Sequence, residues 1–316
     1  MPFLAPTGTV FPRPVIVTRQ TILQARSDMK MPSIENQYRF QIRGLEFDFL
    51  SRTHIMGILN VTPDSFSDGG FYFDTLKAVE HGLRMAEEGA DFIDIGGEST
   101  RPGSQPVTDA LEIARVVPVI ERLVREVKIP LSIDTCKSRV AEAALQAGVS
   151  IVNDISGMTF DPQMMPVAQR LNATVVLMHI KGTPRTMQLS PQYESVIREV
   201  FEFLSTQSAK ARERGIRQII VDPGIGFGKD LGHNLDIIKG LKTFALLGCP
   251  LLVGPSRKSF LGKLLDLPVG ERLEGSAAAV TACVLHGANI VRVHDVKQMK
   301  RVACVADALK GDVAPL

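Results

Sequence analysis

Short apolar runs recur along the chain from His54 onward, and each is followed by a stretch with the period of an amphipathic helix. The apolar runs, which predict eight buried strands, are 55–59, 91–96, 130–134, 149–154, 174–179, 218–222, 250–254 and 289–294. The helical stretches are about 74–89, 108–127, 137–147, 162–171, 191–214, 233–246, 258–285 with a break near Pro268 to Gly270, and 296–310. Strands that alternate with helices favour a parallel sheet. Eight such units fit a closed (β/α)8 TIM barrel of the α/β class.

Polar residues follow nearly every one of these predicted strands. They are Asn60, Glu98 to Arg101, Asp134, Asn153, Asp154, His179, Asp222, Ser256 to Lys258, Arg292 and His294. In a TIM barrel the active site lies at the carboxyl ends of the strands. A doubly wound open sheet also explains the alternation of strands and helices, but it does not explain why polar groups end almost all of the strands. The sequence therefore favours the barrel, with a site at this end.

Residues 38–49 have a different pattern, in which apolar and polar side chains alternate on both sides of Arg43 and Gly44. This pattern predicts a β-hairpin, and we expect the hairpin to cover the amino-terminal mouth of the barrel. The chain is thus predicted to form one barrel domain over residues 38–316, preceded by an extension over residues 1–37.

The extension is rich in arginine over its first 30 residues, where Asp28 is the only acidic residue. It has no apolar segment of the length found in secretory signals. We expect either a disordered extension or a start codon assigned too early, with Met29 and Met31 as the alternative starts. An arginine-rich transit peptide is the less favoured interpretation.

Composition narrows the class of protein. The chain has 316 residues, of which 45% are hydrophobic, and its 36 basic residues nearly balance 34 acidic ones. This balance argues against nucleic-acid binding through bulk charge, and no apolar run is long enough for a membrane span. The four cysteines are Cys136, Cys249, Cys283 and Cys304. They form no CxxC pair and no zinc-ligand spacing, and they are typical of reduced thiols in a cytoplasmic enzyme.

Two loops after predicted strands have residues that suit an anion or a metal ion. Residues 60–70 form either an ordinary turn or a mobile active-site loop in which the Asn60 amide oxygen is a ligand of Mg2+. Residues 96–103 form either a flexible connector or a loop that brings Arg101 to a phosphate, because guanidinium groups suit phosphate. Neither loop has the spacing of a nucleotide-binding fingerprint.

Four strand-end residues, considered together, suit a flat heterocycle that is rich in nitrogen. They are Asp134, Asn153, Asp222 and Lys258. Each aspartate alone could be a helix cap. As a group, however, the carboxylates can accept two parallel N–H bonds from an amino-amide edge, while the amide and the ammonium supply donors. This is the hydrogen-bonding edge of a pterin or a guanine.

The segment from Gly254 to Ser259 precedes a predicted helix, and it is either a helix cap or an anion site at the helix amino terminus. Arg292 and His294 alternate along the last strand, so both face the same side. If Val291 and Val293 face the helices, the two polar side chains point into the barrel mouth, where an anionic ligand is their natural partner.

Eight segments carry a resemblance to a known family. They are MGILNVTPDSFSDGG (56–70), IDIGGESTRPG (93–103), SIDTCK (132–137), IVNDISG (151–157), MHIKGTPRTMQ (178–188), VDPGIGFGKD (221–230), SRKSFLG (256–262) and RVHDV (292–296). In this order they closely resemble dihydropteroate synthase, the folate-pathway target of sulfonamides, over about residues 38 to 310. Ile180-Lys181 and Pro255 depart from the common pattern, but neither removes a functional side chain.

The resemblance implies a transferase that joins 6-hydroxymethyl-dihydropterin diphosphate to p-aminobenzoate and releases pyrophosphate. It also implies Mg2+ as cofactor and a cytoplasmic homodimer. The implied roles are Asn60 as the metal ligand; Asp134, Asn153, Asp222 and Lys258 for the pterin; Thr100, Arg292 and His294 for the pyrophosphate; Phe66, Thr100, Pro102, Phe227 and Ser259 for p-aminobenzoate; and Asp134, Lys258 and Arg101 as catalytic residues.

Two other functions stay open at this point. The pterin-binding barrel of a cobalamin-dependent methyltransferase would share the pterin pocket, but it would not need segments 100–102 and 256–258. A non-catalytic paralogue that binds pterin or pyrophosphate is the second alternative. The residues that argue against it are Asn60, Arg101, Arg292 and His294.

Overall fold

The computed structural model describes residues 37–62, 70–100 and 104–311, and these residues fall in one compact unit. The strands are β1 (Arg39–Ile42), β2 (Leu45–Asp48), β3 (His54–Asn60), β4 (Phe92–Gly96), β5 (Leu131–Asp134), β6 (Ile151–Asp154), β7 (Thr174–Met178), β8 (Ile219–Asp222), β9 (Leu252–Val253) and β10 (Ile290–Val293). The helices are α3 (Gly70–Glu87), α4 (Asp109–Glu126), α5 (Ser138–Gln146), α6 (Met164–Arg170), α7 (Val196–Glu213), α8 (Leu231–Lys239), α9 (Ser259–Leu265), α10 (Leu273–Leu285) and α11 (Val296–Lys310), with 3-10 turns η2 (Leu241–Leu247) and η3 (Val269–Glu271).

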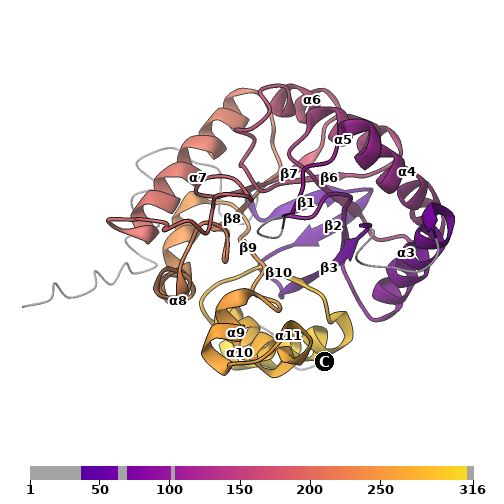
Figure 1. The fold of residues 1–316 in the computed structure, drawn as a ribbon. Coiled ribbons are helices and arrows are strands. Elements are labelled where there is room, and N and C mark those ends of the chain that lie inside the picture. Colours follow the sequence, from indigo (N-terminus) through magenta and orange to yellow (C-terminus); the bar gives the residue numbers. More distant parts are fainter. Residues whose placement is uncertain (1–36, 63–69, 101–103, 312–316) are drawn as a thin grey trace, which may run out of the picture. The chain divides into compact units, whose positions relative to one another are not determined.

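Strands β3 to β10 form one parallel sheet in the order β8-β7-β6-β5-β4-β3-β10-β9. A parallel bridge between Val221 of β8 and Leu251, next to β9, closes this sheet into a barrel. Figure 1 shows the strands at the centre with the helices around them. The predicted TIM barrel is therefore confirmed, and the open-sheet alternative is wrong.

Alternation along the strands divides each one between two apolar layers. In β4, Ile93 and Ile95 pack into the large cluster between the strands and the helices, whereas Phe92 packs into a second cluster inside the barrel. Successive side chains of a strand point to opposite faces. Asp94 has the same parity as Phe92, so its carboxylate points into the barrel. It is fully buried there.

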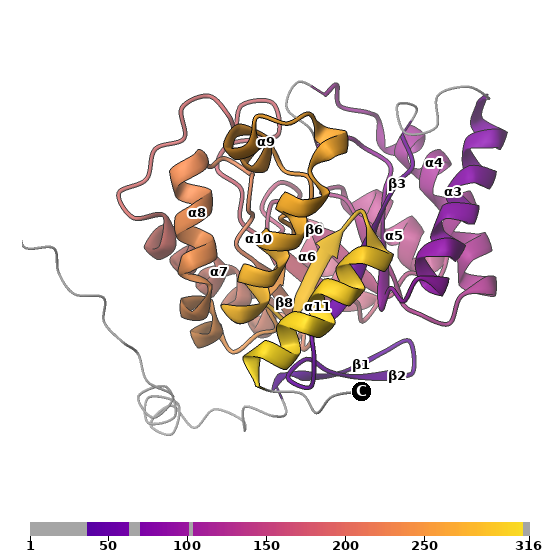
Figure 2. The ribbon, with the colours of Figure 1, turned by 90° about the horizontal axis from the view of Figure 1, so that it is seen from below.

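The predicted hairpin is the antiparallel pair β1 and β2, which turns at Arg43 and Gly44. Its aromatic residues Phe40, Phe47 and Phe49 belong to the same buried cluster as the inward-facing strand residues. Figure 2 shows the hairpin across one end of the barrel, opposite the end at which α9 lies. The expected cover over the amino-terminal mouth is confirmed, so this end contributes apolar packing and the opposite end is left for a site.

The Arg43 side chain fixes the hairpin to the rest of the unit. Its guanidinium donates hydrogen bonds to the carbonyl oxygens of Val124, Val127 and Ile129, at and just beyond the end of α4. The last carbonyl groups of a helix have no partner within the helix. Arg43 supplies that partner and ties the hairpin to α4.

Two predicted helices begin or end elsewhere in the structure. The stretch predicted over 191–214 begins as a helix only at Val196, because Ser195 caps it by accepting a hydrogen bond from the Arg198 amide. The stretch predicted over 233–246 is α8 followed by η2, with the division at Gly240. A Cβ atom at Gly240 would lie 2.6 Å from Ile197 Cδ1, so α7 packs too closely there for a larger residue.

None of the helices in the described ranges is both long and apolar enough to cross a membrane.

Candidate active site

The register of the sheet brings the predicted strand-end residues to one level. Asn60 of β3 pairs with Gly96 of β4, and Gly96 pairs with Asp134 of β5. Asp134 in turn pairs with Asn153 of β6, and Asp222 ends β8 at the same mouth. Residues predicted from separate segments of sequence therefore meet at the carboxyl end of the barrel.

A buried ion-pair network joins three of these strands to β10. The Arg292 Nε atom lies 2.6 Å from Asp94 Oδ2, and its Nη2 atom lies 2.7 Å from Asp134 Oδ2. Asn153 Nδ2 donates to the same Asp94 oxygen at 2.9 Å. The guanidinium thus bridges two carboxylates, which is the arrangement that allows a charge inside a barrel.

Arg292 points into the barrel because its neighbours do not. Val291 and Val293 are fully buried in the cluster between strands and helices, as the alternation in the sequence predicted. Asp94, by contrast, was missed among the candidate residues. Its signal was an aspartate between Ile93 and Ile95 in a predicted strand, at a position that faces the interior.

Burial and the Arg292 charge shift the pKa of Asp134 in opposite directions. Burial raises the pKa of Asp134 and the nearby Asp94 carboxylate adds to this effect, while the Arg292 guanidinium opposes both. The 2.7 Å contact with Arg292 means that the ionised form of Asp134 is held by a charged donor. A ligand that brings further N–H donors would stabilise the same ionised form.

Asp222 and Lys258 form a second charged group on the other side of the mouth. The Asp222 Oδ1 atom accepts a hydrogen bond from the Gly224 amide at 2.7 Å, so Oδ2 is the oxygen left for a ligand. Burial raises the pKa of Asp222 to about 6, against the hydrogen bond from Gly224. Burial also lowers the pKa of Lys258 to about 8, with help from Arg292.

Phe227 lies directly against this lysine. The Lys258 Nζ atom is 4.0 Å from the centroid of the Phe227 ring, which is within cation–π range. The ring is almost fully buried. Ser259, which follows Lys258 and begins α9, is exposed. The structure thus brings the Phe227 ring, from a distant segment, against the lysine that precedes this hydroxyl.

His294 is a neutral donor at the other edge. Its pKa is lowered to about 3 by burial and by the charges of Arg292 and Arg257. Its backbone amide donates to Ser256 Oγ at 3.3 Å, and that hydroxyl lies 3.1 Å from His294 Nδ1. A hydroxyl that donates to Nδ1 leaves the imidazole proton on Nε2. His294 therefore suits an anion as a hydrogen-bond donor, without a charge of its own.

Arg257 precedes Lys258 in the loop before α9, and its side chain is held by another element. Its backbone φ is 55°, and its guanidinium forms an ion pair with Asp295 at the start of α11. The carbonyl oxygens of Arg257 and Lys258 accept hydrogen bonds from Arg272. The Arg257 side chain is thus engaged in holding the loop before α9, and Lys258 is the residue of the motif that faces the mouth.

The remaining predicted site residues divide into two groups. Phe66, Arg101 and Pro102 lie outside the described residues. Asn60 lies at the end of β3, where a Cβ atom added to Gly96 would be 3.8 Å from Asn60 Oδ1 and 3.9 Å from Asp134 Oδ2. These two oxygens therefore lie over one point of the barrel rim.

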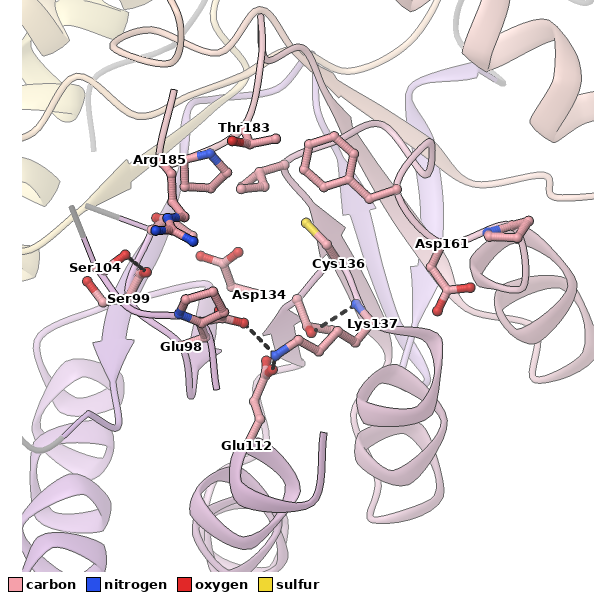
Figure 3. A pocket seen from close by; sticks show the side chains of 17 residues that line it. Glu98, Ser99, Ser104, Glu112, Asp134, Cys136, Lys137, Asp161, Thr183 and Arg185 are labelled. Atoms are coloured by element: carbon pink, nitrogen blue, oxygen red, sulfur yellow. Dashed lines mark hydrogen bonds and ion pairs between the residues drawn. The ribbon is translucent and has the colours of Figure 1, made fainter. Parts of the chain in front are cut away.

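A cavity of about 550 Å3 opens beside Asp134. It is lined by residues of the loops after β4, β5, β6 and β7, among them Thr100, Cys136, Phe160 and Arg185. Figure 3 shows Asp134 and Arg185 directed into it from opposite sides. The cavity adjoins the charged mouth and gives a ligand bound at Asp134 room to extend outward.

One side of this cavity is held by a half-buried lysine. Lys137 Nζ lies 2.6 Å from Glu98 Oε2 and 2.8 Å from Glu112 Oε2, as the dashed lines of Figure 3 mark. It also donates to the Val107 carbonyl at 2.6 Å. These contacts join the loop after β4 to the amino termini of α4 and α5.

A model of the family described as pterin binding enzyme matches residues 56–294. The dihydropteroate synthase of Synechocystis is 49% identical over 266 residues, which are 83% of this chain and 92% of the relative. The chain belongs to the dihydropteroate synthase family. It is accordingly an enzyme, a transferase of folate biosynthesis.

Solved structures of this family have the same fold. The dihydropteroate synthase of Yersinia pestis in complex with a sulfonamide drug superposes with a TM-score of 0.82 at 41% identity, over 86% of this chain and 99% of that one. The Xanthomonas albilineans dihydropteroate synthase with 4-aminobenzoic acid gives a TM-score of 0.81 at 42% identity, over 86% and 98%. These matches confirm the resemblance that the eight sequence segments indicated.

Proposed function

We propose that the site joins 6-hydroxymethyl-dihydropterin diphosphate to p-aminobenzoate, with dihydropteroate and pyrophosphate as products. The observation that carries the proposal is the hydrogen-bonded network in which Asn153 and Arg292 donate to Asp94, and Arg292 also donates to Asp134. Asp222 and Lys258 lie at the same mouth. The mouth therefore provides acceptors for an amino-amide edge next to donors for a phosphate. The family to which the chain belongs supports the choice of substrates.

In this proposal the pterin lies over Asn153 and Asp222. Asn153 uses its Nδ2 group on Asp94, so its Oδ1 atom remains to accept a pterin N–H. Asp222 has Oδ2 free for the same purpose because Gly224 occupies Oδ1. The Lys258 ammonium donates to a ring carbonyl or nitrogen. Together these groups match the alternating donors and acceptors of the pterin edge.

The pyrophosphate lies at Arg292 and His294. Arg292 supplies charge, and neutral His294 donates through Nε2. Thr100, at the end of the described part of the loop after β4, is a further contact implied by the family resemblance. Charge that develops on the leaving group is stabilised by donors already in place.

Mg2+ is the proposed cofactor, and Asn60 is the residue that would hold it. The amide oxygen suits Mg2+, which accepts few protein ligands and takes the rest from water and substrate phosphates. Asn60 Oδ1 and Asp134 Oδ2 border the same point of the rim, so the oxygen chemistry fits. Bound Mg2+ would neutralise charge on the departing pyrophosphate.

The chain's own residues then control bond formation. As the C–O bond to pyrophosphate breaks, positive charge develops on the pterin methylene, and the Asp134 carboxylate stabilises it. The amine of p-aminobenzoate attacks this carbon beside Lys258 and the Phe227 ring, and its proton is lost to solvent. The amine is already a nucleophile, so no dedicated base is proposed. Phe66, Arg101 and Pro102 lie outside the described residues, and their proposed roles are those that the family resemblance implies.

A turnover assay tests this function and separates it from that of a non-catalytic pterin-binding paralogue. Purified protein with Mg2+, dihydropterin diphosphate and p-aminobenzoate should release pyrophosphate continuously. Release should stop when p-aminobenzoate is omitted. Binding of the pterin without release under any of these conditions would establish the paralogue instead.

We also propose that the protein is cytoplasmic and homodimeric. All four cysteines lie in the described residues and none of them forms a disulfide, which is typical of a reducing compartment. The homodimer rests on the family resemblance alone. Light scattering of the purified protein should give twice the mass of the chain, and a monomer at micromolar concentration would contradict it.

A further inference from the structure

Lys229 is a buried lysine that the proposed mechanism does not use. Only 2% of its surface is exposed, and within the described ranges it forms no ion pair with a carboxylate. Its Nζ atom lies 3.0 Å from His179 Nδ1 and 2.9 Å from the Phe227 carbonyl oxygen. A third contact, to the His179 carbonyl oxygen, is 3.4 Å long. A cation so placed is costly to bury, so its three acceptors call for an explanation.

These contacts fill the centre of the loop between β8 and α8. We name residues 223–228 the glycine loop, since Gly224, Gly226 and Gly228 have φ of 72°, 85° and 62°. A Cβ atom at Gly224 would lie 1.9 Å from the His179 carbonyl oxygen. The glycine loop therefore curls tightly against the end of β7, and the Lys229 ammonium lies inside the curl.

Three side chains bind the backbone of the glycine loop from outside it. Gln188 donates to the Gly226 carbonyl at 2.9 Å, and Tyr193 donates to the Gly228 carbonyl at 2.8 Å. Asn234 accepts from the Gly226 amide at 2.6 Å. The Phe227 carbonyl lies between these points, and Lys229 is the side chain that binds it.

Phe227 is the residue through which the glycine loop reaches the site. Its ring faces the Lys258 ammonium at 4.0 Å, and Lys258 Cδ would lie 3.0 Å from a Cβ atom at Gly226. Rotation of the Phe227 peptide would move the ring and this contact together. Lys229 opposes that rotation because it links the Phe227 carbonyl to His179, the residue just beyond the end of β7.

We propose that Lys229 is a positioning residue for the second substrate: with His179 as its anchor, it sets the Phe227 ring against which p-aminobenzoate binds. It contacts neither substrate and acts through Phe227. The proposal rests on the proposed function, because p-aminobenzoate is assigned to this ring there. His179, one of the polar strand-end residues noted in the sequence, becomes part of the support beneath the ring.

The decisive variant is Lys229→Met, which removes the ammonium and nearly keeps the volume. The change leaves the acceptors on His179 and Phe227 without this donor, so circular dichroism of the variant must first match that of the wild type. The KM for p-aminobenzoate should rise about tenfold while the dissociation constant of the pterin diphosphate stays within about twofold of the wild type. Lys239→Met is the matched control, because Lys239 is an exposed lysine of the adjacent helix α8, and it should change neither constant.

A second variant tests the anchor. His179→Asn keeps an acceptor in the position of Nδ1 and should retain most of the wild-type KM for p-aminobenzoate. His179→Leu offers no acceptor from its side chain and should resemble Lys229→Met. An equal rise of KM in His179→Asn and His179→Leu would contradict the role of the Lys229 contact.

Hydrogen exchange supplies a readout that does not depend on activity. Backbone amides of residues 223–229 should exchange faster in Lys229→Met than in the wild type or in Lys239→Met, and the rest of the barrel should be unchanged. Unchanged exchange in this segment, or a p-aminobenzoate KM equal to that of the wild type, would overturn the positioning role. An inactive wild-type protein would count against the proposed function alone, since the exchange comparison still tests the Lys229 support.

Discussion

Arg292 and Asp94 form the inner contact of the site, with Arg292 Nε 2.6 Å from an Asp94 oxygen that has no exposure to solvent. The same oxygen accepts a hydrogen bond from Asn153 Nδ2. The Nη2 atom of the same guanidinium contacts Asp134. Asp94 therefore fixes the orientation of the Arg292 guanidinium at the mouth of the barrel. The pair thus belongs to both the core of the barrel and the floor of the site.

Asp94→Ala should be strongly destabilising. The change takes one of the two carboxylates from Arg292 and the acceptor from Asn153 Nδ2, while Asp134 still contacts the guanidinium. We therefore expect a loss near the lower end of the about 3–5 kcal/mol that breaking a buried ion pair costs in free energy of unfolding. Urea denaturation measures this change. Glu142→Ala is the control, since Glu142 pairs with Arg170 on the surface, where pairs contribute under about 1 kcal/mol. Equal effects in the two variants would mean that the Arg292 network is not a stabilising contact.

Asp222→Asn should weaken pterin binding without disturbing the loop that follows. The amide oxygen can still accept from the Gly224 amide, but the acceptor for the pterin is replaced by a donor. We expect the pterin dissociation constant to rise about 100-fold, as for loss of a buried charge-assisted hydrogen bond. Calorimetry measures it, with exposed Asp236→Asn as control. Normal binding by Asp222→Asn would place the pterin elsewhere.

The rate should depend on pH through Asp222 and Lys258. Asp222 must be ionised to accept pterin N–H groups, and its pKa is raised to about 6 by burial, so kcat/KM should fall as the pH drops below that value. Lys258 must be protonated to donate, and its pKa is lowered to about 8 by burial, so kcat/KM should fall above that value. The acid and alkaline limbs of the kcat/KM profile report macroscopic pKa values of the free enzyme. A profile that stays level from pH 5 to 9 would contradict both assignments.

Deletion of residues 1–30 should leave turnover intact. The buried cluster at the amino-terminal mouth begins with Tyr38 and includes the hairpin, so the barrel has its cover without the preceding residues. The measurement is kcat and KM of the shortened chain beside the full one. Loss of activity on deletion would show that the extension belongs to the fold.

The barrel could be predicted because its signals are local. Alternation within each strand fixes which side chains face inward, so Arg292 was placed correctly from Val291 and Val293 alone. The strand-end aspartates Asp134 and Asp222 follow from the same periodicity. Closure through β8 and β9 depends on chain geometry, yet eight strand–helix units are sufficient to suggest it.

What the sequence missed depends on contacts between distant segments. Asp94 was counted within an apolar run, and its role in the site is evident only from its hydrogen bond with Arg292, which lies far along the chain. Arg257 lies in the segment predicted as a helix cap or an anion site, and the structure pairs its side chain with Asp295. The direction of the Lys229 side chain is set by a loop of left-handed glycines that packs on His179. No periodicity encodes these partners.

Formation of the C–N bond between the pterin methylene and p-aminobenzoate is the most direct test of the proposed function. The wild-type protein would be incubated with Mg2+, dihydropterin diphosphate and ring-labelled 13C p-aminobenzoate, and the products followed by mass spectrometry together with pyrophosphate. We predict labelled dihydropteroate in amounts equal to the pyrophosphate released. Pyrophosphate released without labelled dihydropteroate, or no product from protein that binds both substrates, would contradict the account.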